Sequence, residues 1–172
     1  MLYSELLAIF NELPLFESPE AIKILREQYG LDAPDPVIKE IYYALAGFER
    51  HQTLYGHLEL SKIEWIRTEL PSAVFLGIGD NATFPNYLHE VSEDYHGEGF
   101  FLDLRPEVDE HWRKFGTWLE PPFLIDRSLL VPKANGLHLV EGHTRVGTLL
   151  GALKYNFVTV AKRHSIFLAK KK

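Results

Sequence analysis

The sequence predicts an α+β protein, with a helical segment at 1–54 and an α+β domain at 55–172. Two patterns support this fold class. Apolar residues recur every three to four positions through the first segment, as in amphipathic helices, whereas strand-length apolar runs alternate with helix-like stretches from Tyr55 onward. A chain of 172 residues is long enough to bury one substantial core and too short for two large domains.

Three helices are predicted in the first segment, at 4–13, 19–29 and about 36–52. A serine N-cap opens the first, and a serine or aspartate followed by proline opens the other two. Pro14 and Gly30 mark the ends of the first and second helices. We expect these helices to have a packing role.

The middle of the chain combines strand and helix signals. Ser61 and Glu64 form a capping-box pattern, which favours a helix, and the apolar run at 73–79 is rich in β-favouring residues. The predicted order is a short strand near 58–60, a helix at 61–70, a buried strand at 73–79, a turn at 80–83, a short helix and loop at 84–98, a strand at 100–102 and a helix at 106–116.

The last third of the chain has the clearest pattern. Asn135-Gly136 is a strong hairpin signal, and Gly147 and Gly151 are expected to let a helix approach a sheet closely. The predicted order is a strand at 123–125 after two prolines, an apolar run at 129–131, a turn at 133–136, a strand at 137–140, a helix from the Gly142 turn to about Tyr155 and a closing strand at 164–168.

Composition excludes several classes of protein. The absence of cysteine excludes disulfides, thiolate metal sites and cysteine nucleophiles. No apolar run approaches the roughly 20 residues of a membrane-spanning helix, and the N-terminus lacks the basic region of a secretory signal. We therefore expect a cytoplasmic protein with no membrane partner. The spacing of His138, His143 and His164 matches no familiar ligand set, so no metal site is predicted.

The net charge of −6 is unevenly distributed, because residues 1–120 carry about −13 and residues 121–172 carry about +7. A basic last segment suits an anionic ligand, whereas the acidic remainder makes nucleic acid an unlikely main ligand. The alternative is that the basic segment pairs with acidic residues of its own chain.

The candidate site is the run Glu141-Gly142-His143-Thr144-Arg145, which places a carboxylate, an imidazole, a hydroxyl and a guanidinium at a glycine turn before a helix. Gly142 is expected to allow a sharp turn and a close approach to a ligand. Glu141 is a candidate acceptor for a ribose or substrate hydroxyl, or a water-mediated ligand of Mg²⁺.

The start of this helix suits a phosphate group. The amides of 143–146 and the Arg145 guanidinium are expected to bind phosphate oxygens, with His143 and Thr144 as further donors. In the alternative interpretation, Thr144 is only an N-cap, and Arg145 pairs with Glu141 or with an acidic helix.

The element order over 119–169, with two prolines before a strand and a glycine box between the next strand and a helix, resembles the ParB/sulfiredoxin-like superfamily. In that superfamily a Gly-x-x-Arg or Gly-x-His-Arg turn opens a helix against a small sheet. The box here is most similar to the Asp-Gly-His-(His/Thr)-Arg box of the free-serine kinases, which binds nucleotide phosphates. The resemblance implies a small mixed sheet packed by helices, with a nucleotide bound by Gly142, His143, Thr144 and Arg145.

The resemblance to the kinases also implies an acidic base early in the domain, for which Glu69 is the candidate, and Glu141 and His143 of the box are the other candidate catalytic residues. Two departures limit what it implies. His143 stands where sulfiredoxins have their reactive cysteine, which excludes that reductase activity. Thr144-Arg145 replaces the Arg-Arg of the partition proteins and no helix-turn-helix follows, which argues against chromosome partitioning.

From these observations we expect a protein that binds a nucleotide (ATP, ADP or CTP) or another phosphorylated small molecule, with Mg²⁺ as an accompanying ion. The activity expected of such a site is that of a small-molecule phosphotransferase or nucleotide hydrolase. The alternative is a non-catalytic ParB-like binding module in a DNA-transaction, phage-defence or toxin-related system.

Overall fold

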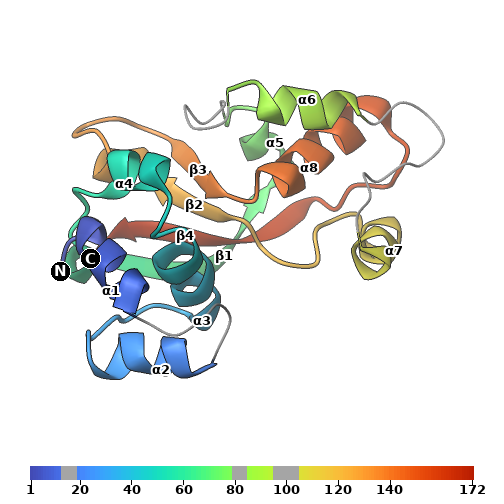
Figure 1. Ribbon diagram of the computed structural model, residues 1–172. Coiled ribbons are helices and arrows are strands. Elements are labelled where there is room, and N and C mark those ends of the chain that lie inside the picture. The colour runs from blue at the N-terminus through green and yellow to red at the C-terminus, as the bar shows by residue number, and fades with distance from the viewer. Residues whose placement is uncertain (13–18, 79–84, 95–104) are drawn as a thin grey trace. The chain divides into compact units, whose positions relative to one another are not determined.

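The computed structural model describes residues 1–12, 19–78, 85–94 and 105–172 (Figure 1). Within these ranges the chain forms helices and a four-stranded mixed sheet, which confirms the predicted α+β class. The helices are α1 (Leu6–Glu12), α2 (Pro19–Glu27), α3 (Asp35–Val37), α4 (Glu49–Tyr55), α5 (Ser72–Phe75), α6 (Tyr87–Glu93), α7 (Pro106–Phe115) and α8 (His143–Tyr155). The strands are β1 (Ile63–Pro71), β2 (Phe123–Asp126), β3 (Leu137–Glu141) and β4 (Arg163–Lys171).

The sheet has the strand order β1-β4-β2-β3. The chain divides into two compact units, each assembled from separate stretches of sequence, and β1, β2 and β4 each contribute residues to both. Unit 1 comprises Met1–Ile66, Ile125–Gly136 and Leu168–Lys172, and unit 2 comprises Arg67–Leu124 and Leu137–Phe167.

Most of the predicted elements are confirmed. The helices expected at 4–13, 19–29, 84–98 and 106–116 correspond to α1, α2, α6 and α7, and the elements of the last third correspond to β2, β3, α8 and β4. The turn expected at 80–83 and the strand expected at 100–102 lie outside the described residues.

A cluster of buried aromatic side chains holds unit 1 together. The Tyr3 hydroxyl donates to the Ile41 carbonyl at 2.8 Å, and the Trp65 indole N–H donates to the Tyr42 hydroxyl at 2.8 Å. Tyr3 also packs edge-on against Tyr42 and Tyr55. Burial raises the pKa of Tyr3 and of Tyr42 far above the ordinary value, so both hydroxyls keep their protons.

The prediction of one continuous third helix, at about 36–52, is wrong, because α3 leads into a π-helix at Ile38–Ala44. The wider turn appears in the hydrogen bond from the Leu45 N–H to the Glu40 carbonyl, at 3.1 Å. The chain then passes Gly47, where a Cβ would lie 3.0 Å from an atom of the Phe10 ring. Packing against this ring, which is remote in sequence, accompanies the break before α4.

The helix expected at 61–70 is also wrong, because this stretch forms most of β1. Ile63 and Trp65 are buried on either side of an exposed residue, which is the alternation of a half-buried strand. Ser61, expected to cap a helix, instead donates to the Glu59 carboxylate at 3.2 Å.

The buried strand expected at 73–79 is wrong for its described residues, which begin with helix α5. Phe75 and Ile78 are buried, whereas Leu76 is 68% exposed. Burial three residues apart fits a helical turn, and a short apolar run does not distinguish a strand from such a turn.

Two shorter expectations are revised. Near 58–60 the structure has an isolated antiparallel bridge between Leu2 and Glu59. The apolar run at 129–131 follows a 3₁₀-helix at Arg127–Leu129 and is not a strand, so β2 itself is the sheet neighbour of β3.

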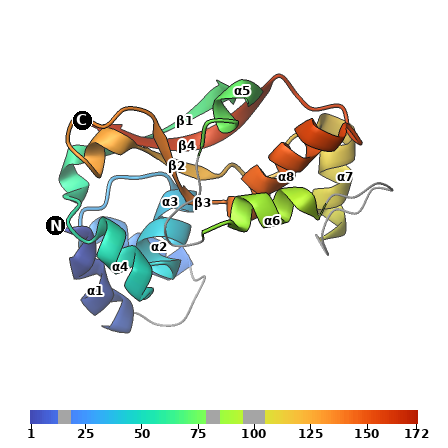
Figure 2. The same ribbon diagram turned by 90° about the horizontal axis from the view of Figure 1, so that it is seen from above.

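In unit 2, α6 and α8 lie side by side, as both views show (Figures 1 and 2). Gly147 makes this packing possible, because a Cβ there would lie 2.6 Å from the Cβ of Val91. The close approach expected at Gly147 is therefore to a helix and not to a sheet. Beyond it, the Glu93 carboxylate pairs with Lys154 and accepts from the Tyr155 hydroxyl at 2.8 Å.

Two polar anchors in unit 2 fix the segment that precedes β2. The Trp118 indole N–H donates to the Ser165 carbonyl at 2.7 Å. The Thr117 hydroxyl lies 2.8 Å from Nδ1 of the buried His164, whose Nε2 lies 2.9 Å from the Ser72 hydroxyl. This segment is consequently held against β4 from both Thr117 and Trp118.

Across the described ranges, every helix is too short or too polar to cross a membrane.

Candidate functional site

Gly142 forms the turn between β3 and α8. Its φ is +98°, in the left-handed region that favours glycine, and a Cβ there would lie 2.5 Å from the Cβ of Pro122. The close approach at Gly142 is thus to Pro122. The turn places the side chains of His143, Thr144 and Arg145 on the first turn of α8, a helix of 13 residues.

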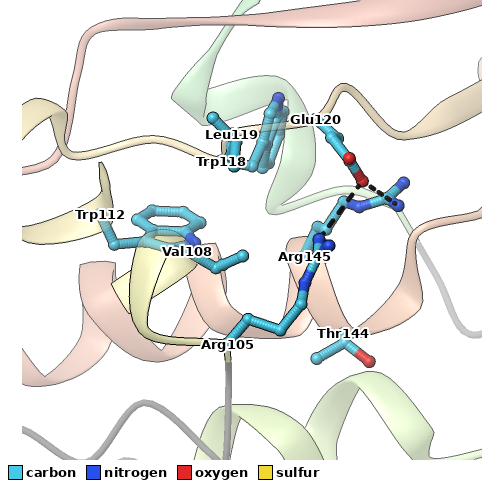
Figure 3. Close-up of a pocket in the computed structure, with 8 residues that line it drawn as sticks. All are labelled: Arg105, Val108, Trp112, Trp118, Leu119, Glu120, Thr144 and Arg145. Atoms are coloured by element: carbon cyan, nitrogen blue, oxygen red, sulfur yellow. Dashed lines mark ion pairs between the residues drawn. The ribbon is translucent and has the colours of Figure 1, made fainter. Parts of the chain in front are cut away.

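Arg145 lines a cavity of about 300 Å³ in unit 2 (Figure 3). The walls come from α7, from the segment before β2 and from the start of α8. The lining residues are Arg105, Val108, Trp112, Trp118, Leu119, Glu120, Thr144 and Arg145.

Two guanidinium groups in this cavity face one carboxylate. Nη2 of Arg145 lies 3.6 Å from Oε2 of Glu120, and Nη2 of Arg105 lies 3.7 Å from the same oxygen (Figure 3). Both separations exceed the 2.7–2.9 Å or so of a charge-assisted hydrogen bond. Arg145 has a second contact, because its Nη1 donates to the Pro121 carbonyl at 3.3 Å. The carboxylate is therefore held loosely between two arginines from different helices.

Arg105 reaches the cavity because of the way α7 begins. Pro106 is the first residue of that helix, where its fixed φ is suited to the start, and Arg105 is the N-cap. Arg105 also pairs with Glu107, with Nε and Oε1 separated by 3.4 Å. The Arg105 side chain is 62% exposed and that of Arg145 is 23% exposed. The cavity thus presents one largely exposed guanidinium and one mostly buried guanidinium.

Two tryptophans form the apolar wall. Trp112 and Trp118 are 1% and 4% exposed, and their rings pack edge to face with centroids 6.2 Å apart. Trp118 also packs against Phe75 and His164. Because the core covers most of both rings, their main role is packing.

A smaller cavity of about 200 Å³ is lined by Tyr87, Glu141, His143 and Thr144. The Tyr87 hydroxyl lies 3.2 Å from the Thr144 hydroxyl, and the Tyr87 ring meets the edge of the His143 ring with centroids 6.3 Å apart. Nδ1 of the buried His143 lies 3.8 Å from Oε2 of Glu141. The two cavities share Thr144 as a common wall.

The Glu141 carboxyl is held in its ionised form. Burial acts to raise its pKa, but the His143 imidazole, the Gly142 N–H and the Arg145 guanidinium together outweigh burial and lower the pKa below the ordinary value. Glu141 therefore faces the smaller cavity as a carboxylate at neutral pH.

The geometry tests details of both interpretations of the box, as a phosphate-binding turn and as a structural turn with Thr144 as N-cap. Thr144 is not the N-cap, because Gly142 holds that position, and Arg145 pairs with Glu120 while its charge also helps to lower the pKa of Glu141. The Val146 N–H donates to the Gly142 carbonyl at 3.0 Å, so it is not a phosphate donor, contrary to expectation.

Glu69 lies apart from the other predicted site residues. It is on β1 and lines neither cavity, and its carboxylate lies 3.5 Å from Nε of Arg163. Glu141, Gly142, His143, Thr144 and Arg145 are contiguous, and the turn brings them together. Among the residues that the structure describes, no group of three or more His, Asp and Glu side chains is arranged to hold a metal ion.

Three polar residues that line these cavities, namely Tyr87, Arg105 and Glu120, were not predicted from the sequence. Tyr87 opens a short helix in a stretch of weak periodicity, and the other two are separated from the box by more than twenty residues. The sequence signal for Arg105 is its position before the helix-starting Pro106, and that for Glu120 is its position before two prolines.

No family model, curated protein or solved structure matches this chain.

Proposed function

We propose that this chain binds a nucleotide or another phosphorylated small molecule at the start of α8, with the phosphate held by Arg145 and Arg105. The observation that carries the proposal is the cavity of about 300 Å³ that is lined by two arginines, Arg105 at the N-cap of α7 and Arg145 in the first turn of α8, beside Thr144. Guanidinium groups bind phosphate oxygens in pairs, and the N-terminus of a long helix favours an anion. The resemblance of the box to that of the free-serine kinases supports the same ligand class.

The smaller cavity supplies groups for chemistry on that ligand. Glu141 is an ionised carboxylate next to the His143 imidazole, and the Tyr87 and Thr144 hydroxyls face the same space. A carboxylate and an imidazole beside a bound phosphate are suited to activating a hydroxyl or a water for phosphoryl transfer. We assign Glu141 as the base and His143 as the group that orients or protonates the substrate.

Mg²⁺ would enter this site with a nucleotide. Such an ion generally binds through one or two protein carboxylates together with the phosphates, and it keeps several waters. Glu141 is the carboxylate of the smaller cavity and is the residue that would hold the ion through water.

Calorimetric titration with ATP, ADP, CTP and pyrophosphate, with and without Mg²⁺, tests binding. Arg145→Ala is expected to weaken the affinity for the bound ligand by about 30-fold, which corresponds to about 2 kcal/mol for a lost charge-assisted contact. Arg163→Ala is the matched control, because Arg163 pairs with Glu69 away from both cavities. Equal affinities in the two variants, or no binding by the wild type, would contradict the proposal.

An assay for phosphate release or transfer, run on the ligand that binds, separates the two function classes. A phosphotransferase or hydrolase should lose turnover in Glu141→Gln while its affinity stays within a few-fold. Binding without turnover in the wild type would identify a non-catalytic binding module.

A further inference from the structure

We propose that Glu120 occupies the place of the ligand's phosphate, and that the ligand class is a terminal phosphomonoester which displaces this carboxylate from between Arg105 and Arg145. The inference rests on the proposed function and extends it, because it names the group displaced and the form of phosphate bound. It makes Glu120 an intramolecular competitor for the site.

The Glu120 carboxylate lies where the phosphate of a ligand would contact both arginines. A single oxygen of Glu120 faces both guanidinium groups, at 3.6 Å and 3.7 Å, which is where an oxyanion bridging the two arginines would place its own oxygens. Neither contact is a close hydrogen bond, whereas a phosphate with three terminal oxygens can approach both arginines at about 2.8 Å. A phosphate therefore makes better contacts than the residue it replaces.

The Glu120 side chain can move out of the cavity without disturbing the arginines. Its side chain is 53% exposed, so a change of rotamer moves the carboxylate into solvent. Arg145 keeps its contact with the Pro121 carbonyl, and Trp118 keeps the backbone of this segment tied to Ser165. The binding groups thus remain in place after the exchange.

The charge of the ligand decides which class of phosphate gains from the exchange with Glu120. A phosphomonoester carries nearly two negative charges at neutral pH, whereas a phosphodiester carries one, as the Glu120 carboxylate does. Exchange of Glu120 for a diester brings no additional charge to the two guanidinium groups, whereas exchange for a monoester does. The cavity consequently favours a terminal phosphate and disfavours a nucleic-acid backbone.

Glu120→Gln tests the displacement, because it removes the competing charge and keeps the size of the side chain. Two ion pairs between partly exposed side chains correspond to roughly 2- to 30-fold in affinity, so the variant is expected to bind the phosphomonoester AMP more tightly by a factor in that range, at constant ionic strength. Glu107→Gln is the matched control, since it removes a charge that pairs with Arg105 but does not line the cavity. It should change the affinity by less than about twofold.

Comparison of AMP with 3′,5′-cyclic AMP tests the ligand class, because the two share base and sugar and differ in having a monoester or a diester. AMP is expected to bind more tightly in both the wild type and Glu120→Gln. Equal or tighter binding of the cyclic diester would overturn the assignment to monoesters. An unchanged or lower affinity in Glu120→Gln, with Arg145→Ala still weakening the wild type, would overturn the role of Glu120 alone. Absence of binding in the wild type and in every variant would overturn both proposals.

Discussion

His164 shows how a single buried residue can be fixed in one protonation state. The Ser72 hydroxyl donates to the Ala161 carbonyl at 2.7 Å, so its oxygen is left to accept from Nε2–H of His164, while Nδ1 accepts from the Thr117 hydroxyl. Both ring nitrogens of a neutral imidazole are satisfied in this way. Burial lowers the pKa of His164 to about 4. The Ala161 backbone and the Glu69 charge raise this pKa, but their combined effect is smaller than that of burial.

This arrangement predicts a pH dependence of stability. Because the folded pKa of about 4 lies below the ordinary value of 6.5, the unfolded chain binds more protons between these values. The free energy of unfolding should therefore fall as pH drops from about 6.5 to 4, by up to about 3 kcal/mol from this residue. Urea unfolding across that range should show the loss in the wild type and in the exposed control His57→Gln. A slope that is unchanged in His164→Gln would contradict the assignment.

At Gly142 the backbone conformation and the lack of space both require glycine. Gly142→Ala combines a positive φ with a Cβ 2.5 Å from Pro122, so we expect a loss of on the order of 3 kcal/mol in the free energy of unfolding. Gly30→Ala is the control, because Gly30 also has a positive φ, +66°, but its Cβ would meet nothing within 4 Å. It should cost about 1 kcal/mol. Similar losses in the two variants, measured by urea unfolding, would show that the contact with Pro122 has no energetic weight.

At the scale of elements, the packing of α6 on α8 positions the smaller cavity. Tyr87 at the start of α6 meets Thr144 at the start of α8, and Glu93 at the end of α6 meets Lys154 near the end of α8. The two helices therefore run in the same direction, and Gly147 leaves room for Val91 where they pack against each other.

A double-mutant cycle tests this contact. Gly147→Ala should destabilise the protein by about 1–3 kcal/mol, because the new methyl group meets Val91 at 2.6 Å. Val91→Ala removes Cγ1, one of the two Val91 atoms that the new methyl group meets at 2.6 Å, and keeps Cβ, so the double variant should regain part of the loss and be more stable than the sum of the single changes predicts. Strict additivity in urea unfolding would mean that the contact with Val91 Cγ1 does not contribute to the cost of Gly147→Ala.

Elements with local signals were predicted well, and elements decided by distant contacts were not. The Gly142 turn, the Pro106 start of α7 and the Asn156 end of α8 depend on backbone preferences that the sequence shows directly. β1 and α5 depend on which side chains the core accepts, and short apolar runs leave that choice open. Residues of the π-helix contact residues that are remote in sequence, such as Tyr3 and Trp65, and no local pattern contains these contacts.

At the scale of the molecule, the basic last segment pairs with the acidic part of the chain. Arg145, Lys154 and Arg163 pair with acidic residues inside unit 2, and Lys170 and Lys172 do so inside unit 1. Each of these pairs includes at least one side chain that is well exposed to solvent, so each adds little stability. The sequence indicated both pairing and anion binding, and the exchange proposed at Glu120 makes the two compatible.

The candidate site was predicted only in part, because local sequence patterns do not show which distant residues come together. The box from Glu141 to Arg145 is contiguous, so its residue types and its turn could be recognised together. Arg105, Glu120 and Tyr87 come to the cavities through the folding of separate segments, and their spacing in sequence gives no sign of their proximity.

The central claim is that a phosphate binds between Arg105 and Arg145, and the most direct test is a titration with ADP followed through the arginine side-chain Nε–H signals in ¹H–¹⁵N NMR spectra. Single Arg→Lys variants would assign these signals. The account predicts that the signals of Arg105 and Arg145 shift together and saturate at one ligand concentration, while that of Arg163 stays in place. Signals of Arg105 and Arg145 that stay unchanged while ADP binds, or that move no more than that of Arg163, would contradict it.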